Sequence, residues 1–104
     1  MTSSELDNNH RIWQVVAAIP KGKVSTYGEI AQKAGMFGAA RRVGMALKVL
    51  PVNTRIPWHR VVNAQGRISL PEGSAAHAIQ RDRLESEEIQ FKANGSINLD
   101  RFRW

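Results

Sequence analysis

Apolar and polar positions near the start of the chain alternate with the period of a helix. Large apolar residues recur at spacings of three and four, which places them on one helix face. They are Ile12, Val15, Val16 and Ile19. The pattern predicts a helix over Asn9–Ala18, with Asp7 as its N-cap and Pro20 just beyond its end.

Two further helices are predicted on either side of a glycine-bearing turn. Ser25 or Thr26 can cap a helix over Tyr27–Ala34, because a side-chain oxygen at that position accepts a backbone N–H of the first turn. The turn is Gly35-Met36-Phe37-Gly38, and a third helix follows over Ala39–Leu50, before a proline. Two short helices joined in this way are typical of a helix-turn-helix.

The third helix is amphipathic. Its predicted core face carries Val43, Ala46, Leu47 and Leu50. Its outer strip carries Arg41, Gly44, Met45 and Lys48, with Ala39, Ala40 and Arg42 at the start. Small residues beside a long cation suit close approach to a duplex groove, although Gly44 could equally serve tight packing against another helix.

The second half of the chain predicts a smaller β component. Residues 61–66 are expected to form a strand or turn, and Ala75 begins another helix. Ile89–Phe91 and Ile97–Leu99 flank Asn94-Gly95, which indicates a hairpin consistent with the wing of a winged helix. We therefore expect residues 1–104 to form a single, mainly α domain with a small β part, resembling a winged helix-turn-helix.

Positive charge is concentrated in one half of the sequence. The formal net charge of the chain is +6, whereas residues 11–67 contain ten Lys and Arg against Glu29 alone, which gives +9. Such asymmetry favours a polyanionic partner lying along one face. A basic surface that only aids solubility is the alternative.

Composition excludes several classes of protein. The chain has no cysteine, so disulfides, thiolate zinc sites and thiol chemistry are absent. No apolar run approaches the roughly 20 residues of a membrane span, and the polar start over Met1–Asn9 lacks a signal-peptide core. We expect a cytoplasmic protein, associated with the nucleoid when bound to DNA, without a cofactor, metal site or membrane partner.

The segment Ile56-Pro57-Trp58-His59-Arg60-Val61-Val62 carries the strongest functional signal. It resembles the Ile-Pro-Cys-His-Arg-Val signature of the O6-alkylguanine-DNA alkyltransferases, with Trp58 in place of the cysteine that accepts the alkyl group. An indole is a hydrogen-bond donor only, so Trp58 can stack or fill space but cannot accept an alkyl group. The chain is thus most similar to the alkyltransferase-like proteins, which bind alkylated DNA without repairing it. Taken alone, Trp58 could simply be a core aromatic.

The resemblance extends from about Ile12 to Glu88 and implies roles for DNA contact. Ala39 to Gly44 matches the family's recognition helix, in which the arginine at the position of Arg41 enters the base stack from the minor groove. Lys23 to Ala31 is similar to the segment whose tyrosine, here Tyr27, pushes on the phosphate beside the flipped nucleotide. The expected DNA-binding residues are Tyr27, Arg41, Arg42, Gly44 and Lys48. Alternatively, Tyr27 anchors a helix start and Arg41 contacts a phosphate.

The resemblance also implies a lesion pocket. Its expected lining is Tyr27, Pro57, Trp58, His59, Arg60 and Val61. A downstream helix places Glu87 where the family has the glutamate that orients the histidine, which predicts a vestigial dyad of His59 and Glu87. Glu88 stands where the family usually has glycine, so Glu88 or Glu85 could contact His59 instead.

The expected function is that of a monomeric, non-enzymatic sensor. It would bind duplex DNA containing O6-alkylguanine, flip the damaged base beside Trp58 and mark the site for nucleotide excision repair proteins. Two other classes stay open. One is a winged-helix transcription factor; the other is a lesion hydrolase that uses His59 and Glu87.

Overall fold

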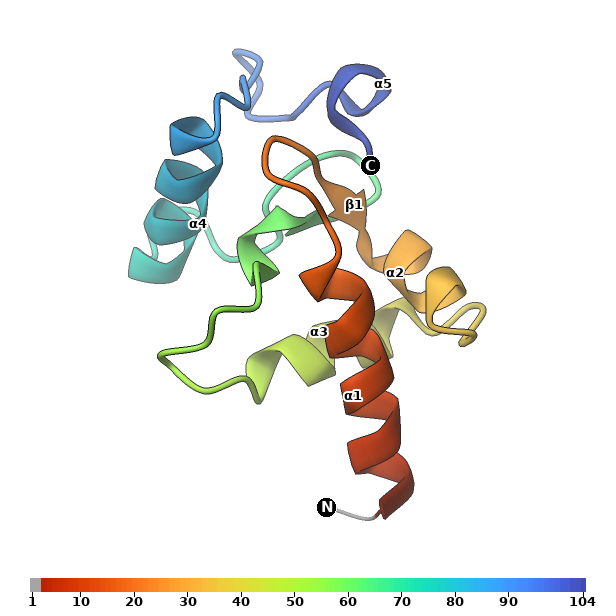
Figure 1. The fold of residues 1–104 in the computed structure, drawn as a ribbon. Helices are drawn as coiled ribbons and strands as arrows, with labels where there is room; N and C mark the ends of the chain where they lie inside the picture. Colours follow the sequence, from red (N-terminus) through yellow and green to blue (C-terminus); the bar gives the residue numbers. More distant parts are fainter. Residues whose placement is uncertain (1–2) are drawn as a thin grey trace.

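Helices predominate in the computed structural model, which describes residues 3–104 apart from the side chain of Glu5 (Figure 1). The helices are α1 (Ser3–Ala17), α2 (Tyr27–Lys33), α3 (Ala40–Lys48), α4 (Ala75–Ser86) and α5 (Leu99–Phe102), with a 3-10 turn η1 (Trp58–Arg60). Two short strands, β1 (Ser25–Thr26) and β2 (Val61–Val62), form the sheet. The predicted mainly α fold with little β structure is confirmed. Met1 and Thr2, part of the predicted polar start, lie outside the described residues.

Helix α1 begins six residues earlier than predicted, at Ser3 instead of Asn9. Asp7 therefore lies inside the helix, and its predicted role as N-cap is wrong. Residues 3–8 are polar except for the exposed Leu6, so the spacing of apolar residues gave no sign of these first turns. Figure 1 shows this end of α1 extending beyond the other helices. The buried stripe begins at Asn9 and Ile12, where α1 meets the rest of the protein.

Helices α2 and α3 form the predicted helix-turn-helix and pack closely against each other. α2 begins as expected, because Thr26 accepts the N–H of Glu29 at 3.2 Å and the Glu29 carboxylate accepts the N–H of Thr26 at 3.0 Å. This reciprocal capping box satisfies backbone donors that the first helical turn leaves free. α3 ends at Lys48, two residues before the predicted Leu50.

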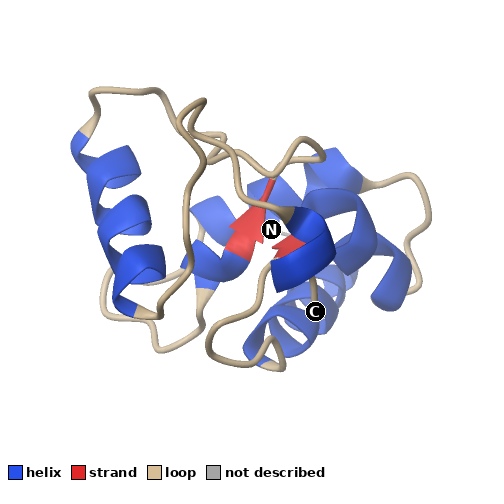
Figure 2. Ribbon diagram, turned by 90° about the horizontal axis from the view of Figure 1, so that it is seen from above, coloured by secondary structure: helices blue, strands red, loops and turns tan. Residues whose placement is uncertain are grey.

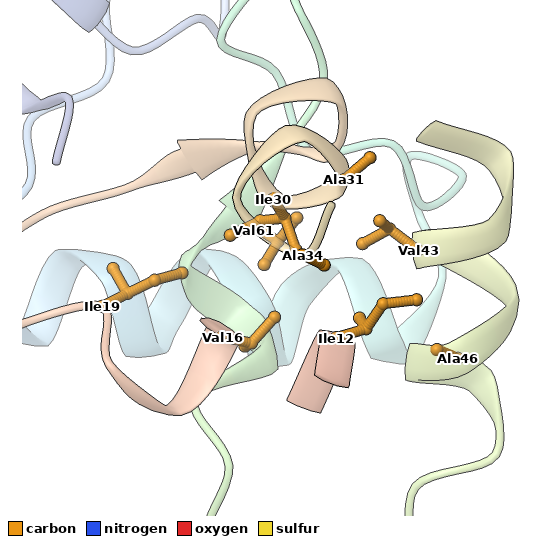
Figure 3. Close-up of a cluster of buried hydrophobic side chains, with 9 residues drawn as sticks. All are labelled: Ile12, Val16, Ile19, Ile30, Ala31, Ala34, Val43, Ala46 and Val61. Atoms are coloured by element: carbon orange, nitrogen blue, oxygen red, sulfur yellow. The ribbon is translucent and has the colours of Figure 1, made fainter. Parts of the chain in front are cut away.

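A cluster of buried apolar side chains, here the N-terminal cluster, joins α1, α2, α3 and β2 (Figure 3). Its members are Ile12, Val16, Ile19, Ile30, Ala31, Ala34, Val43, Ala46 and Val61. Most of the predicted core positions of α1 and α3 belong to it. Val15 and Leu47 are only partly buried at its edge. The cluster fixes α3 so that its opposite face stays on the surface.

The two strands separate the N-terminal cluster from a second one. β1 and β2 pair in parallel, with Ser25 opposite Val61 and Thr26 opposite Val62. Successive strand residues point to opposite faces, so Val61 enters the N-terminal cluster while Val62 enters the other. This C-terminal cluster consists of Val24, Val62, Ile68, Leu84, Ile89, Ile97 and Phe102. Figure 2 shows the strands near the centre, with α4 on one side of them.

The predicted C-terminal hairpin is wrong in extent. Only one antiparallel bridge forms, between Phe91 and Ile97, around the Asn94-Gly95 turn. Leu99 does not continue a strand, because the Asn98 side chain accepts the N–H of Asp100 at 3.1 Å and caps α5. The region in which we predicted a wing therefore has a turn and a short helix in place of two strands.

The end of α4 adopts a left-handed turn at Glu88, with φ of 66°. The N–H of Ile89 donates to Leu84 O at 3.1 Å, and that of Glu88 donates to Glu85 O at 2.9 Å. These two bonds form a Schellman motif, in which glycine is the usual residue at the left-handed position. The left-handed conformation gives a physical reason for the glycine that the resemblance implies here, and α4 forms the motif with a glutamate in its place.

Glu88→Gly should raise the free energy of unfolding by about 1 kcal/mol, because a left-handed conformation costs roughly that much for a residue with a Cβ atom. Urea unfolding of the purified variant measures this change. Glu88→Ala is the matched control, since it removes the carboxylate but keeps the Cβ atom, and it should leave stability near that of the wild type. Equal stability of the glycine and alanine variants would contradict the assignment of strain to Glu88.

Candidate functional site

Tyr27 is the first residue of α2 and connects two parts of the molecule. Its ring packs at the edge of the N-terminal cluster and is partly exposed. Its hydroxyl forms a 2.7 Å hydrogen bond with Ser69 Oγ, in the loop that follows β2. The capping box fixes the backbone on one side of Tyr27, and Ser69 fixes the hydroxyl. Sequence reasoning missed Ser69, since nothing in the local sequence joins residues 42 positions apart.

Four of the five residues predicted to contact DNA lie on α3: Arg41, Arg42, Gly44 and Lys48. Arg41 and Lys48 are exposed, whereas Arg42 and Gly44 are half-buried. A Cβ atom added at Gly44 would lie 3.9 Å from the nearest atom of the Tyr27 ring, which is an ordinary contact distance. Alanine would therefore fit at Gly44, and packing against another helix does not explain the glycine.

The motif residues Trp58, His59 and Arg60 form the single turn η1, between the long loop after α3 and β2. The Trp58 indole is half-buried and meets the His59 ring edge-on, with centroids 6.2 Å apart and planes at 90°. The Arg83 guanidinium lies 5.3 Å from the centre of the Trp58 ring. Trp58 is thus not a fully buried core aromatic, and it retains accessible surface next to a cation from α4.

The Glu87 carboxylate is the centre of the polar contacts behind η1. Arg60 donates to both of its oxygens, from Nε at 3.0 and 3.2 Å and from Nη2 at 2.9 Å. The carboxylate also accepts the backbone N–H of Gly22 at 3.1 Å, and its other oxygen lies 2.7 Å from His59 Nε2. Glu87 is therefore the glutamate that contacts His59, while Glu85 instead faces Arg81 at 3.6 Å on the surface of α4. We call this group of contacts the Glu87 network.

The structure corrects two residues of the predicted pocket. The Arg60 guanidinium donates to Ile19 O at 2.7 Å as well as to Glu87, so it points into the fold and does not line a pocket. Val61 has no exposed surface and belongs to the N-terminal cluster, so it cannot line a pocket either. The resemblance implied these two residues because they belong to the motif, but their side chains point into the fold. Besides Arg60, three of the predicted lining residues keep partly accessible surface: Tyr27, Pro57 and Trp58.

Burial and the network set the protonation of His59 and Glu87. Burial lowers the pKa of His59 below 6.5, and the Glu87 contact opposes that shift only in part. Burial alone would raise the pKa of Glu87, but hydrogen bonds from Arg60, His59 and Gly22 lower it to about 2. At neutral pH, Glu87 is thus a carboxylate, and His59 is mainly neutral. The buried His59 Nδ1 has no hydrogen-bond partner among the described residues.

Gln80 holds the backbone of the motif from the α4 side. Its Nε2 donates to His59 O at 3.1 Å and to Val61 O at 3.0 Å, and the side chain is almost fully buried. Both bonds satisfy carbonyl groups between η1 and β2 that burial would otherwise leave without partners. Sequence reasoning did not single out Gln80, although a polar residue one turn before the buried Leu84 was a signal of this kind.

A cleft of about 560 Å³ lies away from the motif, between α1 and the end of α2. Arg11, Lys33 and Trp104 line it, and none of the predicted pocket residues does. Within residues 3–104, no three His, Cys, Asp or Glu side chains are grouped as a metal site would require. None of the helices in that range is both long and apolar enough to cross a bilayer.

Glu87→Gln should lower the free energy of unfolding by roughly 3 kcal/mol at pH 7, because the fall in pKa from 4.5 to about 2 corresponds to that energy at 1.36 kcal/mol per unit. The folded state holds Glu87 ionised, so this contribution is complete above pH 4.5 and is lost as the pH falls towards 2. Urea titrations at pH 7 and pH 3 should show the gap between wild type and variant narrowing. Glu85→Gln, on the same helix but exposed, serves as the control. A gap that stays constant with pH would refute this account of the network.

Comparison with known proteins places the chain in a family. Residues 7–89 match the family model described as 6-O-methylguanine DNA methyltransferase, DNA binding domain. A DNA base-flipping protein of Escherichia coli is 49% identical over 94 residues, which cover 90% of this chain and 71% of that protein. Alkyltransferase-like protein 1 of Schizosaccharomyces pombe is 44% identical over 98 residues, which cover 90% of this chain and 91% of the relative.

Structural comparison agrees with the sequence matches. The crystal structure of S. pombe Atl1 in complex with damaged DNA containing O6-carboxymethylguanine superposes with a TM-score of 0.85 at 42% identity, covering 100% of this chain and 98% of the other. The similarity therefore extends over the whole fold and is not limited to the motif. Since the family model spans most of the sequence, the chain belongs to the family of the 6-O-methylguanine DNA methyltransferase DNA-binding domain, and it resembles the alkyltransferase-like members of that family.

Proposed function

We propose that this protein is a non-enzymatic sensor of O6-alkylguanine in duplex DNA. The observation that carries the proposal is Trp58, which occupies the position of the family's acceptor cysteine while the surrounding fold and the Glu87 network are intact. With no cysteine anywhere in the sequence, the chain has no thiol that could take an alkyl group. The damaged base would be bound and left unchanged.

Contact with DNA is assigned to α3 and to the start of α2. Arg41 is exposed at the first turn of α3, where it can enter the base stack from the minor groove, and Tyr27 is held beside that helix. Gly44 lacks an explanation from packing within the chain, which supports close approach of DNA to this helix. No acidic residue occurs between Glu29 and Glu72, so a phosphate backbone would meet only positive or neutral side chains from this stretch.

Energetics favour flipping of a damaged base over an intact one. Extrusion costs a few kcal/mol, and less where pairing is already weakened by the lesion. Stacking on an aromatic ring such as Trp58 contributes roughly 1–3 kcal/mol, which is of the same order. An undamaged guanine costs more to extrude and gains no alkyl contact. This difference in the free energy of flipping would provide selectivity for the lesion without a chemical reaction.

The name of one relative and the crystal structure of another support this proposal. The E. coli relative is named a DNA base-flipping protein, and the S. pombe relative is bound to DNA containing O6-carboxymethylguanine. By extension, we propose that the chain acts as a monomer and that the occupied site is passed to nucleotide excision repair proteins. This last step rests on the family resemblance alone.

The direct test is a binding titration with matched duplexes that do or do not contain O6-methylguanine, followed by analysis of the DNA and free alkyl products. The proposal expects tighter binding to the damaged duplex and recovery of the lesion unchanged. Equal affinity for both duplexes would exclude a lesion sensor. Release of methanol and restoration of guanine would instead identify a hydrolase, for which the 2.7 Å pair of His59 and Glu87 supplies the candidate base.

Arg41→Ala should abolish base flipping and remove the preference for damaged DNA, because no side chain then fills the space of the extruded nucleotide. Fluorescence of 2-aminopurine placed opposite or beside the lesion reports the flipping. Lys48→Ala on the same face is the matched control. It should reduce the slope of log K against log salt by about 0.9, as for one lost phosphate contact, and leave flipping intact. Undiminished flipping by Arg41→Ala would remove the role assigned to Arg41.

Trp58→Ala should loosen discrimination among alkyl groups more than it lowers affinity for undamaged DNA, because the indole is proposed to contact the extruded base. A panel of duplexes with methyl, benzyl and carboxymethyl adducts measures the discrimination. Trp13→Phe is a suitable control, since Trp13 is a partly buried aromatic of α1 that donates to Ala46 O at the edge of the N-terminal cluster. If Trp58→Ala unfolds at a lower temperature than the wild type but discriminates among the adducts as the wild type does, the indole is only structural.

A further inference from the structure

Large apolar side chains are exposed on both sides of Arg41 in the sequence. Phe37 keeps 76% of its surface accessible and Met45 keeps 53%, although most side chains of this kind are buried elsewhere in the described residues. Phe37 lies in the turn between α2 and α3, and Met45 lies one helical turn after Arg41. Along the sequence, an exposed cation thus lies between two exposed apolar residues.

Backbone hydrogen bonds fix the turn that carries Phe37 on both sides of that residue. The N–H of Met36 donates to Ala31 O at 2.8 Å, and the N–H of Ala39 donates to Met36 O at 3.1 Å. The Met36 side chain packs against the N-terminal cluster, so it anchors the residue just before Phe37. Gly38 follows with φ of 75°, a conformation that suits glycine. Phe37 is consequently presented outward by an ordered turn.

Helix geometry places Met45 on the face that carries Arg41. Residues four apart on a helix differ by about 40° in direction, so Met45 follows Arg41 closely along one strip. Val43 and Ala46, in contrast, are fully buried on the opposite side. Lys48 is exposed on the same strip as Met45. A binding partner that covers Arg41 and Lys48 therefore also covers Met45.

We infer that Phe37 and Met45 are apolar DNA contacts that flank the inserted Arg41 and hold the opened base step from the minor groove. This inference rests on the proposed function, since it takes DNA as the object that covers α3. Proteins that bend DNA through the minor groove often insert Phe or Met against base steps, and the sugar walls of the groove are also apolar. Such contacts would add affinity that does not depend on charge.

Charge favours DNA over a protein as the occupant of this strip. Met45 shares its face with Arg41 and Lys48, Phe37 is exposed in the turn that leads into this helix, and the sequence has no acid from residue 30 to residue 71. A protein surface that covered the strip would have to neutralise both cations as well as cover Phe37. A duplex meets both requirements, because phosphates border the groove and sugars line it.

The test measures lesion-duplex affinity of Phe37→Ala and Met45→Ala as a function of salt concentration. Each variant should bind about tenfold more weakly, as expected for one large apolar side chain, with the salt slope of the wild type. DNA bending, followed by energy transfer between the duplex ends, should decrease. Phe37→Leu should restore most of the affinity, because it returns apolar volume at the same place. Thermal unfolding of each variant should match the wild type.

Val52→Ala is the control for a general effect of exposed apolar surface, since Val52 is fully exposed in the loop after α3. It should leave binding and bending unchanged. Wild-type affinity and bending in both Phe37→Ala and Met45→Ala would overturn the inference and leave the strip to a protein partner. A lower salt slope in these variants would also overturn it. Equal binding of damaged and intact DNA by the wild type would instead refute the proposed function, while weaker binding by Phe37→Ala would still support the apolar contact.

Discussion

One largely buried carboxylate, that of Glu87, joins the three segments on which the site depends. It receives hydrogen bonds from the turn after α1 through Gly22 and from η1 through Arg60, and it contacts His59. A buried charge without its partners costs several kcal/mol, so these contacts fix the end of α4 against η1. Because Trp58 immediately precedes His59 in the same turn, the network also fixes the backbone of the residue that our proposal places at the position of the family's nucleophile.

Under our proposal, the Glu87 network explains how a site of this family can keep its shape without the transfer reaction. In a transferase, the paired histidine and glutamate prepare a thiol. Here Glu87 contacts a mainly neutral, buried His59, whose ring lies perpendicular to the Trp58 indole. The same geometry would then serve recognition, since a bound base that is not dealkylated stays a ligand at equilibrium. Under our proposal, the long-lived complex of the protein with the damaged DNA marks the site for repair proteins, and no chemical step is needed.

Local signals in the sequence predicted local structure well. Thr26 and Glu29 mark the start of α2, because a capping box needs only residues three apart. The start of α1 was missed because its first turns are polar, and the predicted hairpin failed because Asn98 caps a helix. The contact of Arg60 with Glu87 spans 27 residues and leaves no pattern in either segment. Resemblance predicted the contact of His59 with Glu87, but physical periodicity alone could not.

The most direct test of a sensor that binds without transfer is a crystal structure of this chain with a duplex containing O6-methylguanine. Our account predicts the damaged nucleotide outside the helix, its methyl group still attached and facing Trp58, with Arg41 in the vacated stack. A damaged nucleotide that remains paired within the duplex, or a methyl group found on the protein, would contradict it.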